Sequence, residues 1–209
     1  MRVIVDMPRS SRAVSSFERV QGTDRSRGVE NSCRKAQNVV RNSTARSDNF
    51  GIALYSRRPI TSHRVEHLDD SNVPTIVATI DLDGRSLNVV GTHPLPPMGR
   101  RRSELRDRHL QAIGNLIKRL PPPVMVLGDL NTTSWSPHFR DLLEKCDLRD
   151  SRCGFGVQPT WPVEQWVLRI PIDHALVSED LAVTQRYVGP DIGSDHFPIV
   201  VEFAFLDSP

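Results

Sequence analysis

The sequence predicts a layered α/β domain built on a mixed or antiparallel sheet. Strand-like segments follow one another as in hairpins, and two helical segments interrupt them. The continuous apolar run Val124–Leu127 is typical of a strand buried in the middle of a sheet. Hairpin strands with helices inserted between them indicate a sheet that packs helices against its face.

The first strands are expected in the region that follows residue 49. Phe50–Ser56 is a short apolar run that ends before Pro59, which cannot continue a strand interior. Pro74–Leu82 alternates apolar and polar residues, and Arg85–Thr92 continues the alternation. Asp83-Gly84 lies between these two runs and is a strong signal for a two-residue hairpin turn.

Two segments have the periodicity of amphipathic helices. Ser103–Leu120 places its apolar residues on one stripe, its first residue is a suitable N-cap, and three prolines at 121–123 end it. A second helix is expected to begin at Ser136-Pro137 and to run toward Cys146. Residues 149–170 are rich in Gly and Pro, which predicts a loop.

Three further strand-like segments close the chain, at Ile172–Ser178, Ala182–Val188 and Phe197–Phe205. The 209 residues, 38% hydrophobic and 25% charged, suit one globular domain or at most two small ones. Collagen-like and coiled-coil proteins are excluded, and the sequence contains neither a transmembrane segment nor a secretory signal pattern.

The formal net charge of +2 conceals two unlike parts of the chain. Residues 1–49 hold 10 Lys and Arg against 5 Asp and Glu, whereas residues 50–209 hold 17 against 20. The first part is rich in Ser, Arg and Asn, and its apolar residues show no sustained strand or helix periodicity. We therefore expect a mostly disordered basic leader. A solvated tail is favoured over one that binds nucleic acid. We therefore divide the chain into a leader, 1–46, and a domain, 47–209.

Cys33, Cys146 and Cys153 form no C-x-x-C pair, and their number is odd. This argues against a disulfide framework and against a cysteine-rich zinc site. We expect small buried or half-buried side chains in a reducing compartment, and hence a cytoplasmic protein.

Polar residues that could take part in catalysis or metal binding lie at the ends of the expected strands. These residues are His93, Asp129, Asn131, Asp173, Asp195 and His196. A rigid sheet can present side chains from its strand ends to one cleft. Each residue alone has a structural explanation, such as an Asx turn at Asp129, but four such sites at four strand ends favour a functional one. The other histidines, His63, His67, His109 and His138, lack this context and are assigned no function.

This set of residues suits the hydrolysis of phosphate esters. Carboxylate and amide oxygens suit Mg²⁺ or Mn²⁺ better than zinc. Histidine titrates near neutral pH and can act as an acid or a base. A hard cation with a polarised histidine can direct water onto a phosphate ester. Serine nucleophile chemistry is less favoured, because no G-x-S-x-G motif is present.

These residues lie in motifs that resemble the endonuclease/exonuclease/phosphatase superfamily, the deoxyribonuclease I-like metal-dependent phosphodiesterases. The motifs, in order, are Phe50–Arg57, Gly91-Thr92-His93-Pro94, Gly128-Asp129-Leu130-Asn131, Ile172-Asp173-His174 and Gly193–Pro198. Each motif alone is weak, but the ordered set is specific, and it covers roughly residues 47–205. The resemblance implies a sandwich of two packed sheets with helices on the outer faces.

The resemblance also implies roles for the site residues. Asp195 would be a ligand of the catalytic Mg²⁺ or Mn²⁺. His196 would contact the scissile phosphate as the acid–base group and would be held by Asp173. The residues Asp129 and Asn131 would orient the attacking water and the phosphate. Whether they also help to bind the metal is left open.

The motif Gly91-Thr92-His93-Pro94 completes these implied roles. His93 would donate to a phosphate oxygen. His174 stands where the family accepts several residue types, so no role is assigned to it. The implied substrate is a phosphate ester, with nucleic acid as one candidate, and we expect a monomer.

The chain departs from the family pattern ahead of Phe50. The family carries an N-terminal strand with an Asn and a second strand that ends in a metal-binding Glu. The upstream residues Glu18 and Glu30 do not follow strand-like runs. We therefore expect the domain to lack its first strands, and we hypothesise that residues 1 to about 46 are not its native start, as after a frameshift or a misplaced start codon.

The two leading hypotheses follow from this departure. The first is a divalent-metal-dependent hydrolase of phosphate esters, a phosphodiesterase, nuclease or phosphatase. The alternative is a catalytically impaired relic that acts as a non-enzymatic interaction module, because the metal-binding Glu is missing. A basic nucleic-acid-binding protein that uses the leader and Arg100–Arg102 ranks behind both; a solvated helix start is the favoured explanation of that arginine cluster.

Overall fold

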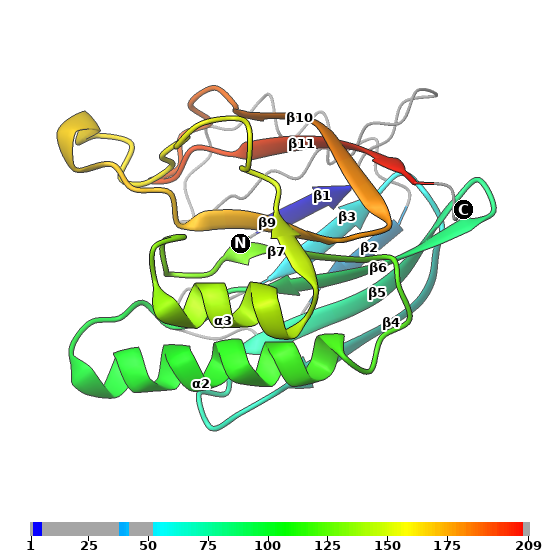
Figure 1. Ribbon diagram of the computed structural model, residues 1–209, viewed down its shortest axis with the longest axis horizontal. Coiled ribbons are helices and arrows are strands. Elements are labelled where there is room, and N and C mark those ends of the chain that lie inside the picture. Colours follow the sequence, from blue (N-terminus) through cyan, green and yellow to red (C-terminus); the bar gives the residue numbers. More distant parts are fainter. Residues whose placement is uncertain (1, 6–37, 42–51, 207–209) are drawn as a thin grey trace.

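The computed structural model describes Arg2–Val5, Asn38–Arg41 and residues 52–206, which form an α/β sandwich (Figure 1). Its centre is a six-stranded sheet in the order β4-β5-β6-β7-β9-β8. These strands are β4 (Ile60–His67), β5 (Pro74–Leu82), β6 (Arg85–Thr92), β7 (Val124–Asp129), β8 (Leu148–Asp150) and β9 (Asp173–Ser178). Neighbours are antiparallel except β6 and β7, which are parallel because a helix crosses between them.

Two helices, α2 (Arg100–Ile117) and α3 (Pro137–Lys145), cover one face of this sheet. α2 is the crossover between β6 and β7, and α3 lies between β7 and β8. The core under the helices contains Val77, Val90, Leu110, Ile113, Leu116, Val126, Phe139 and Leu176. The apolar stripe expected on the first helix is therefore the face that packs on the sheet.

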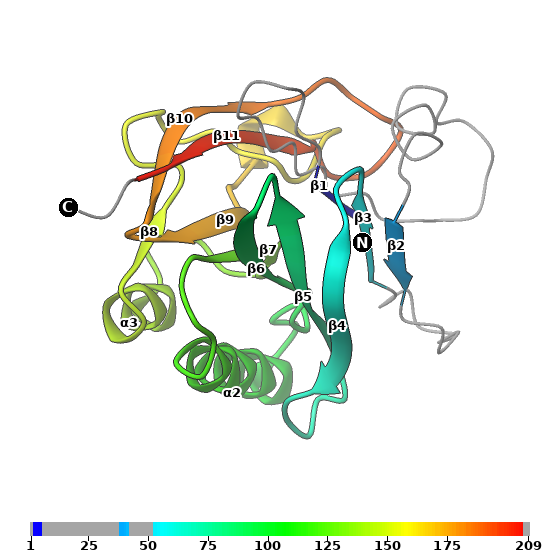
Figure 2. The same cartoon turned by 90° about the vertical axis from the view of Figure 1, so that its right-hand side faces the viewer.

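The opposite face of the central sheet packs against a second layer of strands (Figure 2). In this layer β10 (Leu181–Val188) pairs with β11 (Ile199–Phe205), and β3 (Ala53–Ser56) lies between β1 (Arg2–Val5) and β2 (Asn38–Arg41). Buried side chains between the layers include Leu54, Ile80, Leu127 and Phe203. The two-sheet sandwich implied by the resemblance is confirmed, with helices on one outer face in the part described.

The hairpin expected between the two alternating runs is present. β5 and β6 pair in antiparallel register, with Leu82 opposite Arg85. The turn residues Asp83 and Gly84 have φ of 57° and 89°, the left-handed values that a two-residue primed turn requires. Asp-Gly adopts such values at low cost, which is why the signal in the sequence was reliable.

Some boundaries differ from those expected. α2 begins at Arg100, and Ser103 is not its N-cap, because its hydroxyl donates to the carbonyl of Gly99 from within the first turn. β4 was not expected, since it is a largely exposed edge strand in which only Ile60 and Val65 pack partly against the core. The expected loop 149–170 also holds β8 and a short 3-10 helix, η1 (Trp166–Leu168).

The leader contains two short strands that the sequence analysis did not expect. β1 pairs with β3 in parallel, and β2 pairs with β3 in antiparallel register. The expectation of a mostly disordered leader stays a prediction, with Arg2–Val5 and Asn38–Arg41 forming strands within it. Glu18 and Glu30 lie outside the described residues, so the missing metal-binding Glu stays a prediction.

The remaining expectations concern cysteines and membranes. Cys146 is half-buried, as expected, whereas Cys153 is exposed in the turn that follows β8. Cys33 lies outside the described residues. No helix within the described ranges combines the length and apolarity needed to cross a lipid bilayer.

Candidate active site

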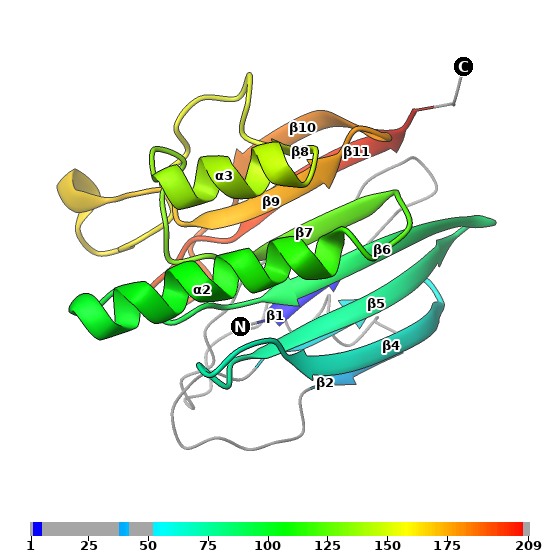
Figure 3. The same ribbon diagram turned by 60° about the horizontal axis from the view of Figure 1, so that its bottom comes forward.

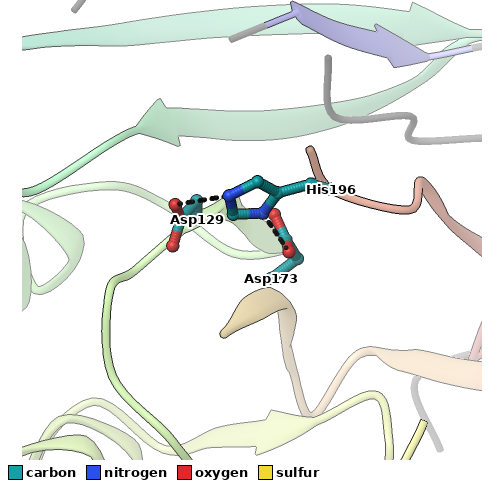
Figure 4. Close-up of side chains that lie close together, drawn as sticks. All are labelled: Asp129, Asp173 and His196. Carbon is teal, nitrogen blue, oxygen red and sulfur yellow. Dashed lines mark hydrogen bonds and ion pairs between the residues drawn. The ribbon is translucent and has the colours of Figure 1, made fainter. Parts of the chain in front are cut away.

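Strand ends bring the main polar residues together at one end of the central sheet. Asp129 closes β7 and Asp173 opens β9, and the two are opposite each other in the antiparallel register. His196 comes from the segment just ahead of β11. One potential ligand atom from each of these three side chains lies within 4.8 Å of the others (Figure 4). The convergence that the sequence could only suggest is therefore present for these residues.

The closest contact in the cluster joins His196 to Asp173. His196 Nδ1 donates to Asp173 Oδ2 at 2.8 Å, and the Asp173 side chain is fully buried. Burial lowers the pKa of His196, but the hydrogen bond and charge of Asp173, with the charges of Asp129 and Asp195, raise that pKa to about 9. The imidazole is thus held in one orientation and favours its protonated form.

Asp129 faces two histidines. His93 Nε2 lies 3.3 Å from Asp129 Oδ2, and His196 Nε2 lies 3.7 Å from the same oxygen. Burial raises the pKa of Asp129, but the hydrogen bond and charge of His93, the charge of His196 and the Asn131 N–H lower the pKa overall. Asp129 therefore remains a carboxylate between two imidazole rings.

Asn131 supports this carboxylate from the loop after β7. Its backbone N–H donates to Asp129 Oδ1 at 2.8 Å, and its side-chain amide donates to the carbonyl of Pro94 at 2.9 Å. Its φ of 49° is left-handed, a conformation that asparagine tolerates better than most residues. Asn131 thus links the segment after His93 to Asp129, and the Asx turn considered in the sequence is also present.

Asp195 lies next to the cluster but outside it. Among the described residues, the set with mutually close ligand atoms is Asp129, Asp173 and His196. Asp195 is half-buried, its backbone carbonyl accepts from Val163 N at 3.1 Å, and its charge acts on His196. Its assignment as a metal ligand stays a prediction.

The donor atoms of the cluster fit a hard divalent cation. Two of the three side chains are carboxylates, and Asp173 Oδ1 is buried without a hydrogen-bond partner in the described part of the chain. A buried carboxylate oxygen without a partner is costly unless a cation or water satisfies it. Mg²⁺ and Mn²⁺ prefer such oxygen ligands.

Sequence reasoning missed Arg186, which lies behind Asp173. Its guanidinium is buried and donates to the Asp173 carbonyl at 3.2 Å, to Ser151 Oγ at 3.2 Å and to Gln158. Burial lowers the pKa of Arg186 to about 10. The register of β10 against β11 shifts between Val183 and Gln185, and a bulge of this kind changes which residues of a strand face inward, so a regular alternation along β10 does not locate Arg186.

Two histidines without an assigned role prove to be buried next to the site. His109 Nε2 lies 3.0 Å from Thr92 Oγ1, directly ahead of His93, and His109 Nδ1 lies 3.3 Å from Asp69. His174 Nε2 donates to the Thr132 carbonyl at 2.8 Å. Burial lowers the pKa of both imidazoles, which indicates neutral, structural side chains.

The Asp173–His196 pair predicts a pH dependence of stability. The pKa of His196 is raised from 6.5 to about 9, so its stabilising contribution is complete below pH 6.5 and is lost as the pH rises through about 9. The free-energy difference of unfolding between wild type and Asp173→Asn should therefore shrink between these two pH values. Urea unfolding in the presence of EDTA, carried out at both of these pH values, measures the difference. The control is Asp107→Asn, which removes a carboxylate beside the exposed His138. If the free-energy difference between wild type and Asp173→Asn is the same at both pH values, Asp173 does not raise the pKa of His196.

The fold and the site together define the class of protein. A sandwich in which Asp129 and Asp173, at the ends of two central strands, meet His196 from the segment ahead of β11 has the groups needed to hydrolyse phosphate esters with a hard cation. Residues 14–196 match the Endonuclease/Exonuclease/phosphatase family, and the chain belongs to this family. Its members are phosphoesterases and are generally dependent on divalent metals. The match begins inside the segment that we assigned to the leader, so the division at residue 46 stays a prediction.

Individual relatives agree with this assignment. A phospholipase C of Staphylococcus aureus is 26% identical over 131 residues, which are 55% of this chain and 39% of the relative. The chain thus spans less than half the length of that relative. The crystal structure of an endonuclease/exonuclease/phosphatase from Bacteroides vulgatus has a TM-score of 0.70 at 16% identity, over 85% of this chain and 79% of that one. One from Beutenbergia cavernae has a TM-score of 0.64 at 19% identity, over 75% and 48%.

Proposed function

We propose that this protein is a Mg²⁺- or Mn²⁺-dependent hydrolase of phosphodiesters or phosphomonoesters that uses the Asp173–His196 pair. The observation that carries the proposal is the 2.8 Å hydrogen bond from His196 Nδ1 to the buried Asp173, which leaves His196 Nε2 directed at Asp129. An oriented imidazolium beside a carboxylate can place one acid and one base on either side of a phosphate.

In this mechanism water attacks phosphorus as the P–O ester bond breaks, and His196, which holds a proton at Nε2, gives that proton to the leaving oxygen. Asp173 keeps the ring in place and stabilises its charge from the Nδ1 side. Asp129 accepts a proton from the attacking water, and the Asn131 N–H fixes the orientation of that carboxylate. His93, which lies 3.3 Å from Asp129, donates to a phosphate oxygen when substrate is present.

The cation would be held by carboxylate oxygens of this cluster, with Asp195 as the ligand that the family resemblance implies. The buried Asp173 Oδ1 supports a positive charge at this place, since it lacks a hydrogen-bond partner in the part of the chain described. When bound, Mg²⁺ or Mn²⁺ supplies Lewis acidity that neutralises charge developing on the phosphate.

The alternative of a catalytically impaired relic rests on the sequence, in which Glu18 and Glu30 do not follow strand-like runs. The cluster, as far as the described residues go, holds two Asp and one His but no Glu. A site short of one carboxylate would bind a divalent cation more weakly. Under this alternative the chain keeps the fold and acts through its surface.

Hydrolysis of bis-p-nitrophenyl phosphate separates the two functions. We expect turnover by the wild type that needs Mg²⁺ or Mn²⁺ and stops with EDTA. Asp129→Asn should lose this activity, whereas Asp141→Asn, an exposed carboxylate on α3 that pairs with Lys145, should keep it. Nicked plasmid and p-nitrophenyl phosphate, assayed in parallel, distinguish a nuclease from a phosphomonoesterase. Equal background rates from all three proteins, with and without metal, would favour the relic.

A further inference from the structure

An apolar tip projects from the loop between β8 and β9. The three consecutive side chains of η1 are strongly exposed, Trp166 at 79%, Val167 at 73% and Leu168 at 64%. Figure 1 shows this segment, in gold, standing away from the body of the molecule. Scattered exposed apolar residues are common, but a contiguous group of large ones marks an interaction site.

The tip stands on a base held by hydrogen bonds. Trp161 and Ile170 exchange two backbone hydrogen bonds, so the two sides of the loop are joined below the tip. The guanidinium of Arg169 donates to the carbonyls of Pro162 and Val163 and lies 4.6 Å from the centre of the Phe197 ring. The exposed side chains are therefore presented in a defined position.

The same loop borders the active site. The Trp161 ring lies 6.1 Å from the His196 ring, and Val163 N donates to the Asp195 carbonyl at 3.1 Å. Phe197 N also donates to the Thr160 carbonyl at 2.9 Å. Whatever the tip binds would be brought close to the Asp173–His196 pair.

A basic segment lies at the same end of the molecule. α2 begins with Arg100–Arg102, all three of which are exposed, after Met98, which is 72% exposed. Figures 1 and 3, which differ by a rotation about the horizontal axis, both place the two segments at the left-hand end, with η1 above and the first turn of α2 below. This end thus combines apolar side chains with positive charge.

We propose that η1 and Arg100–Arg102 form a docking surface for an anionic phospholipid bilayer. Tryptophan beside aliphatic side chains suits the boundary between headgroups and acyl chains, and arginines gain from a negatively charged surface. Single-stranded nucleic acid fits less well, because Val167 and Leu168 offer no aromatic face on which bases stack. This surface goes beyond the proposed function, because docking on lipid requires no turnover.

Cosedimentation with vesicles tests the docking surface. We expect the wild type to bind vesicles of equal phosphatidylglycerol and phosphatidylcholine, and phosphatidylcholine vesicles much less. Trp166→Ser with Leu168→Ser should weaken binding by about tenfold or more. Replacing Arg100–Arg102 with Gln should weaken binding on the anionic vesicles by about tenfold or more and flatten its salt dependence. The matched controls are Leu206→Ser, an exposed apolar residue after β11, and Arg64→Gln on β4.

Three results would overturn the proposal. One is vesicle binding that the tip variant does not change. Another is wild-type binding to oligo-dT but not to vesicles, which would make this end a nucleic-acid surface. The third is a dimer in sedimentation velocity that the tip variant abolishes, which would make it a contact between two copies. Turnover of the soluble bis-p-nitrophenyl phosphate, measured on the same preparations, reports on the active site separately.

Discussion

Replacing His196 by alanine is expected to lower kcat for a phosphate ester by about 10³-fold, with a much smaller change in KM. The imidazole is fixed by the 2.8 Å hydrogen bond to Asp173, and its other nitrogen faces Asp129. Alanine removes the only ring in the described cluster that joins both carboxylates. Steady-state kinetics with bis-p-nitrophenyl phosphate and saturating Mg²⁺ or Mn²⁺ measure the effect.

A second variant separates the acid–base role of His196 from a general loss of structure. Asp173→Asn keeps the shape of the side chain but removes its charge, so the pKa of His196 should fall from about 9. The pH at which activity is lost on the alkaline side should fall with it. His138→Ala, which removes an exposed imidazole on α3, is the matched control and should keep wild-type kinetics. A His196→Ala enzyme within about threefold of wild type would contradict the mechanism.

The sequence pointed to the residues that the structure brings together, because strand ends are visible in it. Each of His93, Asp129 and Asp173 directly adjoins an apolar strand-like run, and a sheet of this kind brings such ends together. What the sequence could not show is how the residues face one another. The role of Asn131 in orienting water and phosphate stays a prediction, and nothing in the sequence indicated that its amide donates to the Pro94 carbonyl.

The buried polar side chains that surround the site, Arg186 and His109, could not be recognised in the sequence for a different reason. No motif singled out Arg186, and an irregular register after Val183 lies just ahead of this residue, whose guanidinium donates to the Asp173 carbonyl. His109 lies on a helix at a position with no local signal, and its partner Asp69 is far from it in the sequence. Such contacts depend on the packing of separate elements, which periodicity does not encode.

The elements of the fold that local sequence signals determine were predictable, whereas strands that depend on pairing with distant segments were not. The β5–β6 hairpin and the face of α2 were predictable, because Asp83-Gly84 and an apolar stripe act locally. β4 was not, because an exposed edge strand needs no apolar alternation and forms by pairing with β5. β1 and β2 likewise depend on the free edges of β3.

Gly128→Ala is expected to destabilise the protein by about 3 kcal/mol, since overpacking of a close contact costs about 1–3 kcal/mol and more when backbone is displaced. A Cβ atom at this position would lie 2.0 Å from the carbonyl oxygen of Thr92, a distance that no side-chain rotation relieves. The strands β6 and β7 would have to separate at their ends. Urea unfolding at constant pH measures the change.

The same substitution also tests how the fold positions the site. Thr92 directly precedes His93, and Gly128 directly precedes Asp129, so the close approach of the two backbones sets the 3.3 Å contact between those side chains. Gly128→Ala should therefore lower kcat even in the fraction that remains folded. The matched control is Gly114→Ala in α2, where the nearest atom is Cys146 Sγ at 3.3 Å and alanine favours the helix; its stability should stay within about 1 kcal/mol of wild type. If both variants unfold at the same urea concentration as wild type, the backbone contact at Gly128 does not hold the ends of β6 and β7 together.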